Sequence, residues 1–199
     1  EPYKKEDLEN KYKVLKKDML SHLSVNSNIP YELVYNLQYI EYPDTLIFDR
    51  VFYDHIEKVE LCDIMQIKKD KLVFVHVKTD FGASIRDVAE QIVTSASVLL
   101  SWRKNPDSAK IDAYYDQLGK MYKDKYKIGR PKITKAGFKK AILKSKKVQY
   151  VLAFIDSKKE VDFKIAKYRS VLAKIAIMNA TKRLVEMGFE LKLIRIRES

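Results

Sequence analysis

The stretch ELCDIMQIKKDKLVFVHVK, residues 60–78, decides the fold. Apolar and β-branched runs on either side of a lysine-rich turn predict two antiparallel strands, Lys58–Ile64 and Lys71–Lys78. Antiparallel neighbours lie about 5 Å apart, so the two strand ends can bring Asp63 and Lys78 together. A carboxylate, a hairpin and a strand that ends in a lysine therefore form one unit.

Hydrophobic periodicity and turn residues predict the elements around this hairpin. Downstream, we expect a helix from Ser84, as its cap, to about Trp102, helices near 107–118 and 134–145, a buried strand at Val148–Ile155, a helix at 163–187 that stops at Gly188, and an edge strand at Phe189–Ile196. Upstream, we expect a helix at 5–23, a turn at Pro43-Asp44 and a short strand at Thr45–Asp49, whereas residues 31–42 fit either a helix or a strand.

The resulting order, α-β-β-β-α-insertion-β-α-β, predicts an α/β fold. Its last three elements form a strand–helix–strand unit, which gives parallel strands with a right-handed crossover. Three meandering strands, a helix and such a unit are the core order of a restriction-endonuclease-like mixed sheet flanked by helices. We expect a single nuclease-like domain over residues 1–199, with a basic helical insertion at about 103–147.

Positive charge is concentrated in that insertion. The chain carries a formal net charge of +12. Residues 102–147 contain 15 Lys and Arg against 4 Asp, a net charge of +11, so the remaining residues are close to neutral. A neutral body with one basic segment is typical of a phosphate-binding surface. A solvated, lysine-rich insertion is the alternative.

The carboxylate and the lysine of the hairpin suit metal-dependent phosphodiester hydrolysis. That reaction needs a metal ion to activate water and to neutralise charge on phosphorus, and Mg²⁺ prefers carboxylate oxygens. We therefore predict that Asp63 binds the metal and that Lys78 stabilises the transition state. A strand-end turn aspartate and an exposed edge lysine are the structural alternatives.

Further metal ligands would come from nearby positions. His76 shares a strand face with Lys78. We predict that His76 is a metal ligand or a positioning residue, and an imidazole ligand suits Mn²⁺ better than Mg²⁺. A core histidine and a lost active site are the alternatives. The second carboxylate would be Glu60 or Asp49. The odd spacing of Glu60 and Asp63 puts them on opposite faces of a regular strand, so both reach one metal only across a bulge or a strand end.

The helix after Lys78 and the basic insertion would contact nucleic acid. Gln91 lies seven residues after Ser84, and it either binds the scissile phosphate, holds the lysine, or is a surface glutamine. The predicted nucleic-acid-binding residues are Ser84, Arg103, Lys104, Lys120, Lys123, Lys125, Lys127, Arg130, Lys132, Lys139 and Lys140. The aromatic residues among these cations either stack on bases or pack the insertion onto the body; they are Trp102, Tyr114, Tyr115, Tyr122 and Tyr126.

Five short motifs carry a resemblance to a family. They are Leu46–Asp49, Glu60–Asp63, Phe74–Lys78, Ser84 through Gln91 to Ala96, and Asn179-Ala180 with Leu184 and Met187–Leu191. The chain resembles the C-terminal part of a sporadically distributed, defence-associated bacterial family, a domain of unknown function with a PD-(D/E)xK-type core. His-Val-Lys is a usual form there, which implies that His76 need not mark a lost site. The resemblance covers roughly residues 44–101 and 148–196 and implies a nuclease that acts on foreign DNA.

We therefore predict a metal-dependent DNA endonuclease that uses Mg²⁺ or Mn²⁺ in restriction or anti-phage defence. Double-stranded DNA is the expected partner, and cleavage of two strands normally needs two active sites, which makes a homodimer possible. One alternative is a catalytically inactive module of the same fold that binds DNA or RNA. Another is a protein whose basic segment docks an acidic partner protein.

Cysteine content and hydropathy bear on the compartment. The single cysteine, Cys62, excludes an intrachain disulfide and a Cys-based zinc site. The sequence contains no signal peptide and no apolar run near the roughly 20 residues of a membrane span. We therefore expect a cytoplasmic protein with no membrane partner. The chain begins with Glu1 and not with Met, which is consistent with a piece of a longer polypeptide.

Overall fold

The structure is a computed structural model. It describes residues 31–40, 42–48, 50–52, 59–124, 126, 129–156 and 164–197. The helix expected at 5–23, the candidate ligand Asp49, and Lys125 and Lys127 of the basic insertion lie outside these residues.

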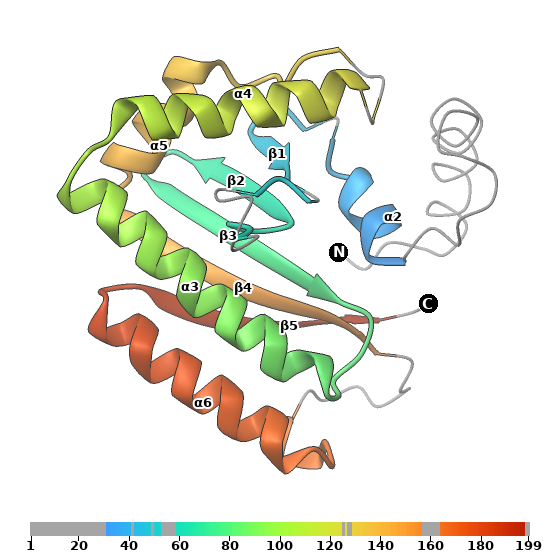
Figure 1. The fold of residues 1–199 in the computed structure, drawn as a ribbon. Coiled ribbons are helices and arrows are strands. Elements are labelled where there is room, and N and C mark those ends of the chain that lie inside the picture. The colour runs from blue at the N-terminus through green and yellow to red at the C-terminus, as the bar shows by residue number, and fades with distance from the viewer. Residues whose placement is uncertain are drawn as a thin grey trace.

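A five-stranded sheet in the order β1-β2-β3-β4-β5 forms the centre of the fold (Figure 1). Its strands are β1 (Thr45–Ile47), β2 (Ile64–Lys68), β3 (Lys71–Lys78), β4 (Lys147–Asp156) and β5 (Glu190–Arg197). Strand β2 is antiparallel to both of its neighbours, whereas β4 and β5 run parallel to β3. The predicted strand at Lys71–Lys78, the parallel return and the edge position of the last strand are confirmed.

Helices flank this sheet. They are α2 (Tyr31–Leu37), α3 (Ser84–Lys104), α4 (Ser108–Asp124), α5 (Lys135–Lys144), the 3₁₀ turn η1 (Ile165–Lys167) and α6 (Val171–Glu186). Figure 1 shows α3 and α6 side by side on one face of the sheet, α4 and α5 beyond β1, and α2 near the end of β3. The fold is therefore α/β with a mixed sheet. Within the described residues, none of the helices combines the length and apolar character that crossing a bilayer requires.

Strand β2 begins at the residue where the sequence pattern predicts its end. The loop between β2 and β3 has two residues, of which Lys69 has a positive φ of 42°. A two-residue loop fixes the register of a hairpin, so Lys68 pairs with Lys71 and Ile64 with Val75. Pairing with β3 thus ends at Ile64. The predicted strand Lys58–Ile64 is therefore wrong for residues 59–63, which precede β2.

The ends of the two long helices differ in their agreement with the sequence pattern. Ala83, and not Ser84, is the N-cap of α3, because the Ser84 hydroxyl instead donates to Asp80 Oδ1 at 3.1 Å. Helix α6 begins at Val171 and not near residue 163 as predicted, because Ser170 caps it by accepting from the Ala173 N–H. It ends as predicted: Gly188 has a φ of 78°, and the Phe189 N–H donates to the Leu184 carbonyl at 2.8 Å. A glycine in the left-handed conformation, together with this hydrogen bond, gives hydrogen-bond donors to carbonyls of the last helical turn that have no partner within the helix.

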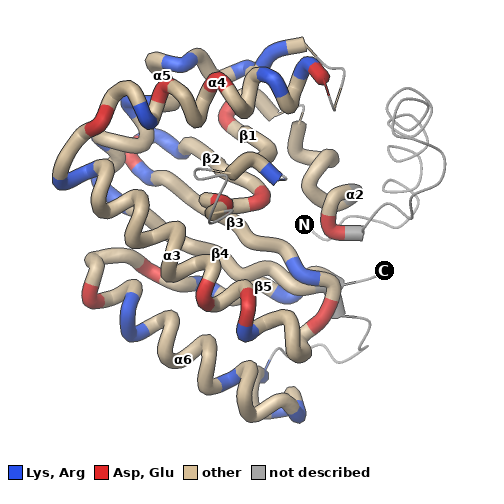
Figure 2. Tube along the Cα trace, in the orientation of Figure 1, with Lys and Arg blue, Asp and Glu red and all other residues tan. Residues whose placement is uncertain are grey.

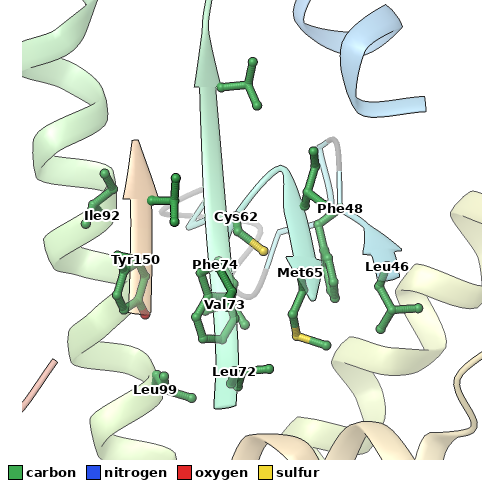
Figure 3. Close-up of a cluster of buried hydrophobic side chains, with 14 of the residues drawn as sticks. Leu46, Phe48, Cys62, Met65, Leu72, Val73, Phe74, Ile92, Leu99 and Tyr150 are labelled. Atoms are coloured by element: carbon green, nitrogen blue, oxygen red, sulfur yellow. The ribbon is translucent and has the colours of Figure 1, made fainter. Parts of the chain in front are cut away.

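Buried hydrophobic side chains, among them Phe74 and Tyr150, fill the core between the sheet and α3 (Figure 3), and Ser95 adds polar contacts to it. Phe74 and Tyr150 stack with ring centroids 5.1 Å apart, and both are fully buried. The Ser95 hydroxyl of α3 donates to the Leu61 carbonyl at 2.6 Å and lies 3.1 Å from the Tyr150 hydroxyl. Ser95 therefore ties α3 to both the sheet and the segment that precedes β2.

We predict that Ser95→Ala lowers the free energy of unfolding by about 1–3 kcal/mol, because it leaves buried polar atoms without a partner. Ser97→Ala is the matched control on the same helix, since Ser97 is exposed and its hydroxyl donates to the Val93 carbonyl one turn back. Urea unfolding of both variants measures the difference, and equal stabilities would contradict the role of Ser95.

Candidate functional site

Strand β3 extends beyond its neighbour β2. The backbone N–H groups on the β2 side of this extension therefore have no partner in β2. Pairing ends at Ile64 and Val75. N–H groups of alternate residues point to the same edge of a strand, so those of Val77 and Thr79 need acceptors other than β2. Asp63 Oδ2 accepts from the Val77 N–H at 2.7 Å. The second acceptor comes from α2.

Glu32 of α2 supplies that acceptor and also contacts the lysine. Its Oε1 accepts from the Thr79 N–H at 3.0 Å, and its Oε2 lies 3.5 Å from Lys78 Nζ. Both side chains are partly buried. The two carboxylates thus bond N–H groups two residues apart, a span of about 6.6 Å along a strand. Glu32 of α2, Asp63 just before β2 and Lys78 of β3 therefore all lie at the end of β3.

Glu32 was missed in the sequence analysis, whereas Asp63 and Lys78 were named. It lies 46 residues before Lys78, in the aromatic segment that periodicity could not assign. The signal available was weak: Glu32 is the acidic residue of the first turn of α2. An acidic residue there is common at any helix start, so it does not by itself point to a site.

The donor chemistry of this group suits a hard divalent cation, with only two protein ligands. Within the described ranges, no three His, Cys, Asp or Glu side chains gather as a metal-binding group. Two carboxylates are nevertheless a usual number for Mg²⁺, which keeps several waters and binds phosphate oxygens. Each carboxylate has about four lone-pair positions, so the hydrogen bonds to β3 leave capacity for a cation at Asp63 and Glu32.

Glu60 lies where its carboxylate supports the backbone. Its Oε1 accepts from the Arg50 N–H at 2.7 Å, and Arg50 has a positive φ of 59°. Burial first, and then the charges of Asp63 and Glu60, raise the pKa of the Cys62 thiol well above its usual value. Glu60 and Asp63 are therefore both near Cys62, but they accept from different parts of the backbone. Glu60 as a metal ligand stays a prediction.

His76 lies in the core and not at the solvent side of the sheet end. It is 3% exposed, and its ring stacks on Tyr150 with ring centroids 6.5 Å apart. Burial, with a smaller contribution from the Lys78 charge, lowers the His76 pKa from 6.5 to about 3, whereas a hydrogen bond to the Leu61 backbone acts in the opposite direction. Its Nε2 has no hydrogen-bond partner in the described part of the chain. The imidazole is thus neutral, the form that binds metals, and its role as a ligand stays a prediction.

Gln91 and Ser84 both lie on α3, the helix that follows β3. The Gln91 side chain is exposed, whereas Ser84 is half-buried and bonded to Asp80. The neighbouring Glu90 forms an ion pair with Arg183 of α6 at 3.1 Å. The described contacts do not join Gln91 to Lys78, and Gln91 lies about two turns into α3, so a phosphate-binding role for Gln91 stays a prediction.

The cations of the insertion fall into two groups. Arg103 donates to the Ile142 and Ser145 carbonyls at 2.8 and 2.7 Å, and burial lowers the pKa of its guanidinium. Lys139 pairs with Asp112 at 2.7 Å. These two hold helices together. The exposed predicted contacts within the described residues are Lys104, Lys120, Lys123, Arg130, Lys132 and Lys140. Figure 2 shows basic positions along α4 and α5, with acidic positions between them.

The aromatic residues of the insertion pack it onto the body. Trp102, Tyr114, Tyr122 and Tyr126 are all buried. The Tyr122 hydroxyl accepts from the Ile47 N–H at 2.9 Å, and the Tyr114 hydroxyl donates to the Val51 carbonyl at 3.0 Å. Bases cannot stack on these rings in the folded protein. Of the two roles considered for the aromatic residues, packing is the one that the structure contains.

We predict that His76 makes stability depend on pH. Because its folded-state pKa of about 3 lies below the ordinary 6.5, the unfolded chain takes up a proton first as the pH falls. Stability is therefore full above pH 6.5 and decreases by about 1.4 kcal/mol per pH unit below it, until the pH approaches 3. His76→Phe, of similar size, should flatten this decrease. Urea unfolding of both proteins between pH 7 and pH 4.5 measures it, and parallel curves would contradict the assignment.

Comparison with known proteins gives a family but no described activity. Searches of curated proteins and of solved structures gave no significant match. The model of a family of unknown function, DUF6119, matches residues 3–197. That range includes Glu32, Asp63 and Lys78 together with all of the described strands and helices. The chain therefore belongs to the family of unknown function DUF6119.

Proposed function

We propose that the protein is a metal-dependent endonuclease that acts on double-stranded DNA, in restriction or anti-phage defence. The observation that carries the proposal is the convergence of Glu32, Asp63 and Lys78 at the end of β3. Two carboxylates at the end of one strand, of which Glu32 is paired with Lys78, supply ligands for a hard cation and a positive charge for a phosphate. The basic insertion supplies the additional charge that a polyanion needs.

The residues would divide the work as follows. Asp63 and Glu32 would hold Mg²⁺ or Mn²⁺, which when bound activates water and offsets charge on phosphorus. Lys78 would donate to an oxygen of the scissile phosphate, and the Glu32 carboxylate at 3.5 Å would keep its ammonium at the strand end. His76, a neutral side chain beneath Lys78 on the same strand, would fix the position of this end of β3 or complete the ligand set.

The topology supports a restriction-endonuclease-like core. The observed order β1-β2-β3-α3-(α4, α5)-β4-α6-β5, preceded by α2, corresponds to the element order that predicts such a core. The helical insertion lies between α3 and β4, as in the prediction. Fold alone does not assign an activity, so the proposal depends on the three side chains.

We predict metal-dependent nicking of supercoiled plasmid that Lys78→Ala reduces by about 100-fold or more, since it removes a charge that acts on the transition state. Lys71→Ala is the matched control: it lies at the other end of the same strand, where its Nζ donates to Gln149 Oε1 at 2.8 Å. Asp63→Asn and Glu32→Gln keep an acceptor oxygen for the Val77 and Thr79 N–H groups. They should abolish metal-dependent cleavage with little loss of stability.

Gel electrophoresis with Mg²⁺, with Mn²⁺ and with a chelator separates the outcomes. Cleavage that persists in Lys78→Ala at the wild-type rate would contradict the site. Absence of cleavage with every metal, while DNA still binds, would contradict the enzyme and favour the second candidate function.

The second candidate is a nucleic-acid-binding module of the same fold. It is favoured by the small ligand set of two carboxylates and by the exposed lysines of α4 and α5, such as Lys120, Lys123 and Lys140. Binding by such a surface releases counterions from the phosphate backbone, and its affinity decreases as salt increases.

We predict that the triple variant Lys120→Gln, Lys123→Gln, Lys140→Gln weakens binding to a fluorescent DNA duplex. The slope of log K against log salt should become shallower by about 0.9 for each phosphate that these lysines neutralise in the wild type. The control triple Lys164→Gln, Lys182→Gln, Lys192→Gln removes the same charge from exposed positions outside the insertion. Fluorescence anisotropy at several salt concentrations measures both slopes. Equal slopes for the two triples would mean that the insertion is not the binding surface.

A further inference from the structure

Helix α6 has two apolar faces, of which the core uses one. The inward face consists of Ala173, Ile177, Ala180 and Leu184, which are all buried. The outer stripe consists of Val171, Leu172, Ile175, Met178 and Val185, with exposures of 62%, 58%, 46%, 69% and 65%. A helix on the surface of a globular protein normally has a single apolar stripe. The outer stripe therefore contributes little to folding of the single chain.

The spacing of the outer stripe is that of a helix-pairing seam. Four of its five residues, at positions 171, 175, 178 and 185, together with Lys182, follow steps of four, three, four and three residues, which is the a/d repeat of a coiled coil. Lys182 is the one polar residue in this row. The row is about 21 Å long at 1.5 Å per residue. A second helix of similar length is the shape that such a seam fits.

Charge at the two ends of α6 favours a second copy of the chain in an antiparallel orientation. Exposed cations precede the helix at Lys164, Lys167 and Arg169. Exposed Glu186 and Glu190 lie at its other end, where the charge of Arg183 is already paired with Glu90 of α3. A two-fold axis near the middle of α6 would place each basic end beside an acidic end of its partner, and it would align the helix dipoles favourably. A parallel pair would instead bring the two Lys182 side chains together.

The size of the stripe also suits a dimer. Five side chains with these exposures present apolar area on the order of 500 Å², at the upper end of what monomers expose. A standard interface covers about 800 Å² on each partner. The stripe supplies more than half of that area, and the exposed charged residues at the two ends of α6 would supply the rest.

We propose that the outer stripe of α6 is a dimer interface that packs antiparallel against α6 of a second copy. This interface does not depend on the proposed nuclease activity. Phe81, which follows β3, packs on Tyr168, which precedes α6, with ring centroids 4.4 Å apart. The start of α6 is thus at the same end of the molecule as the end of β3 (Figure 1). The dimer therefore points its two candidate sites in opposite directions.

Sedimentation equilibrium of the purified chain tests the interface. We predict a mass that rises with concentration from 23.3 kDa towards twice that value, and a constant 23.3 kDa for the double variant Ile175→Glu, Met178→Glu. The control Ala109→Glu, Ala113→Glu, at exposed positions of α4, should behave as the wild type. A wild type that is monomeric into the high micromolar range overturns the proposal, as does a dimer that the double variant leaves intact.

A charge-swap pair keeps the test decisive if the double variant misfolds. Glu186→Lys and Arg169→Glu should each weaken self-association, because each places like charges at the helix ends. An equal mixture of the two should recover dimer, since opposite charges then meet at both ends of the mixed pair. Two variants that dimerise as the wild type, or a mixture that recovers nothing, would contradict the antiparallel arrangement.

Discussion

Backbone N–H groups within a fold need acceptors, and this requirement shapes the end of β3. Strand β2 offers no partner beyond Ile64, so two carboxylates take the place of the missing strand. Asp63 receives the Val77 N–H and Glu32 receives the Thr79 N–H. The backbone of Asp63 adds two hydrogen bonds, from its N–H to the Val75 carbonyl and from the Phe48 N–H to its own carbonyl. One residue thus joins β1, β2 and β3.

The same arrangement gives the candidate site its chemistry. If backbone carbonyls had accepted these hydrogen bonds, the end of β3 would carry no negative charge from its acceptors. Because side chains replace the ladder, the Glu32 carboxylate lies 3.5 Å from the ammonium of Lys78, and the Asp63 carboxylate is held at the Val77 N–H, two residues before the N–H that Glu32 accepts. The cost of partly burying these groups is reduced by their mutual pairing. The same carboxylate oxygens therefore support the backbone and could bind a cation.

The two remaining faces of the molecule serve different purposes. The insertion uses its aromatic residues to pack against β1 and α3, which leaves its exposed lysines as the surface available to a polyanion. Helix α6 buries one apolar face against the sheet and α3 and leaves the other exposed. Binding of an anion and pairing of two copies would thus occur on separate surfaces.

Local pattern determined most of the elements: the strand at Lys71–Lys78, the helices α3 to α5, the end of α6 at Gly188 and the concentration of positive charge, but it placed the start of α6 too early. It also named Asp63 and Lys78, because one hairpin holds both. Only the tertiary structure shows that Glu32 contacts Lys78 and that His76 is buried in the core. It also shows that the Glu60 carboxylate accepts from the Arg50 N–H. Periodicity reports which face of an element is apolar, but contacts between distant segments depend on packing and on which backbone groups lack a partner. Those contacts decide which carboxylates form the candidate site.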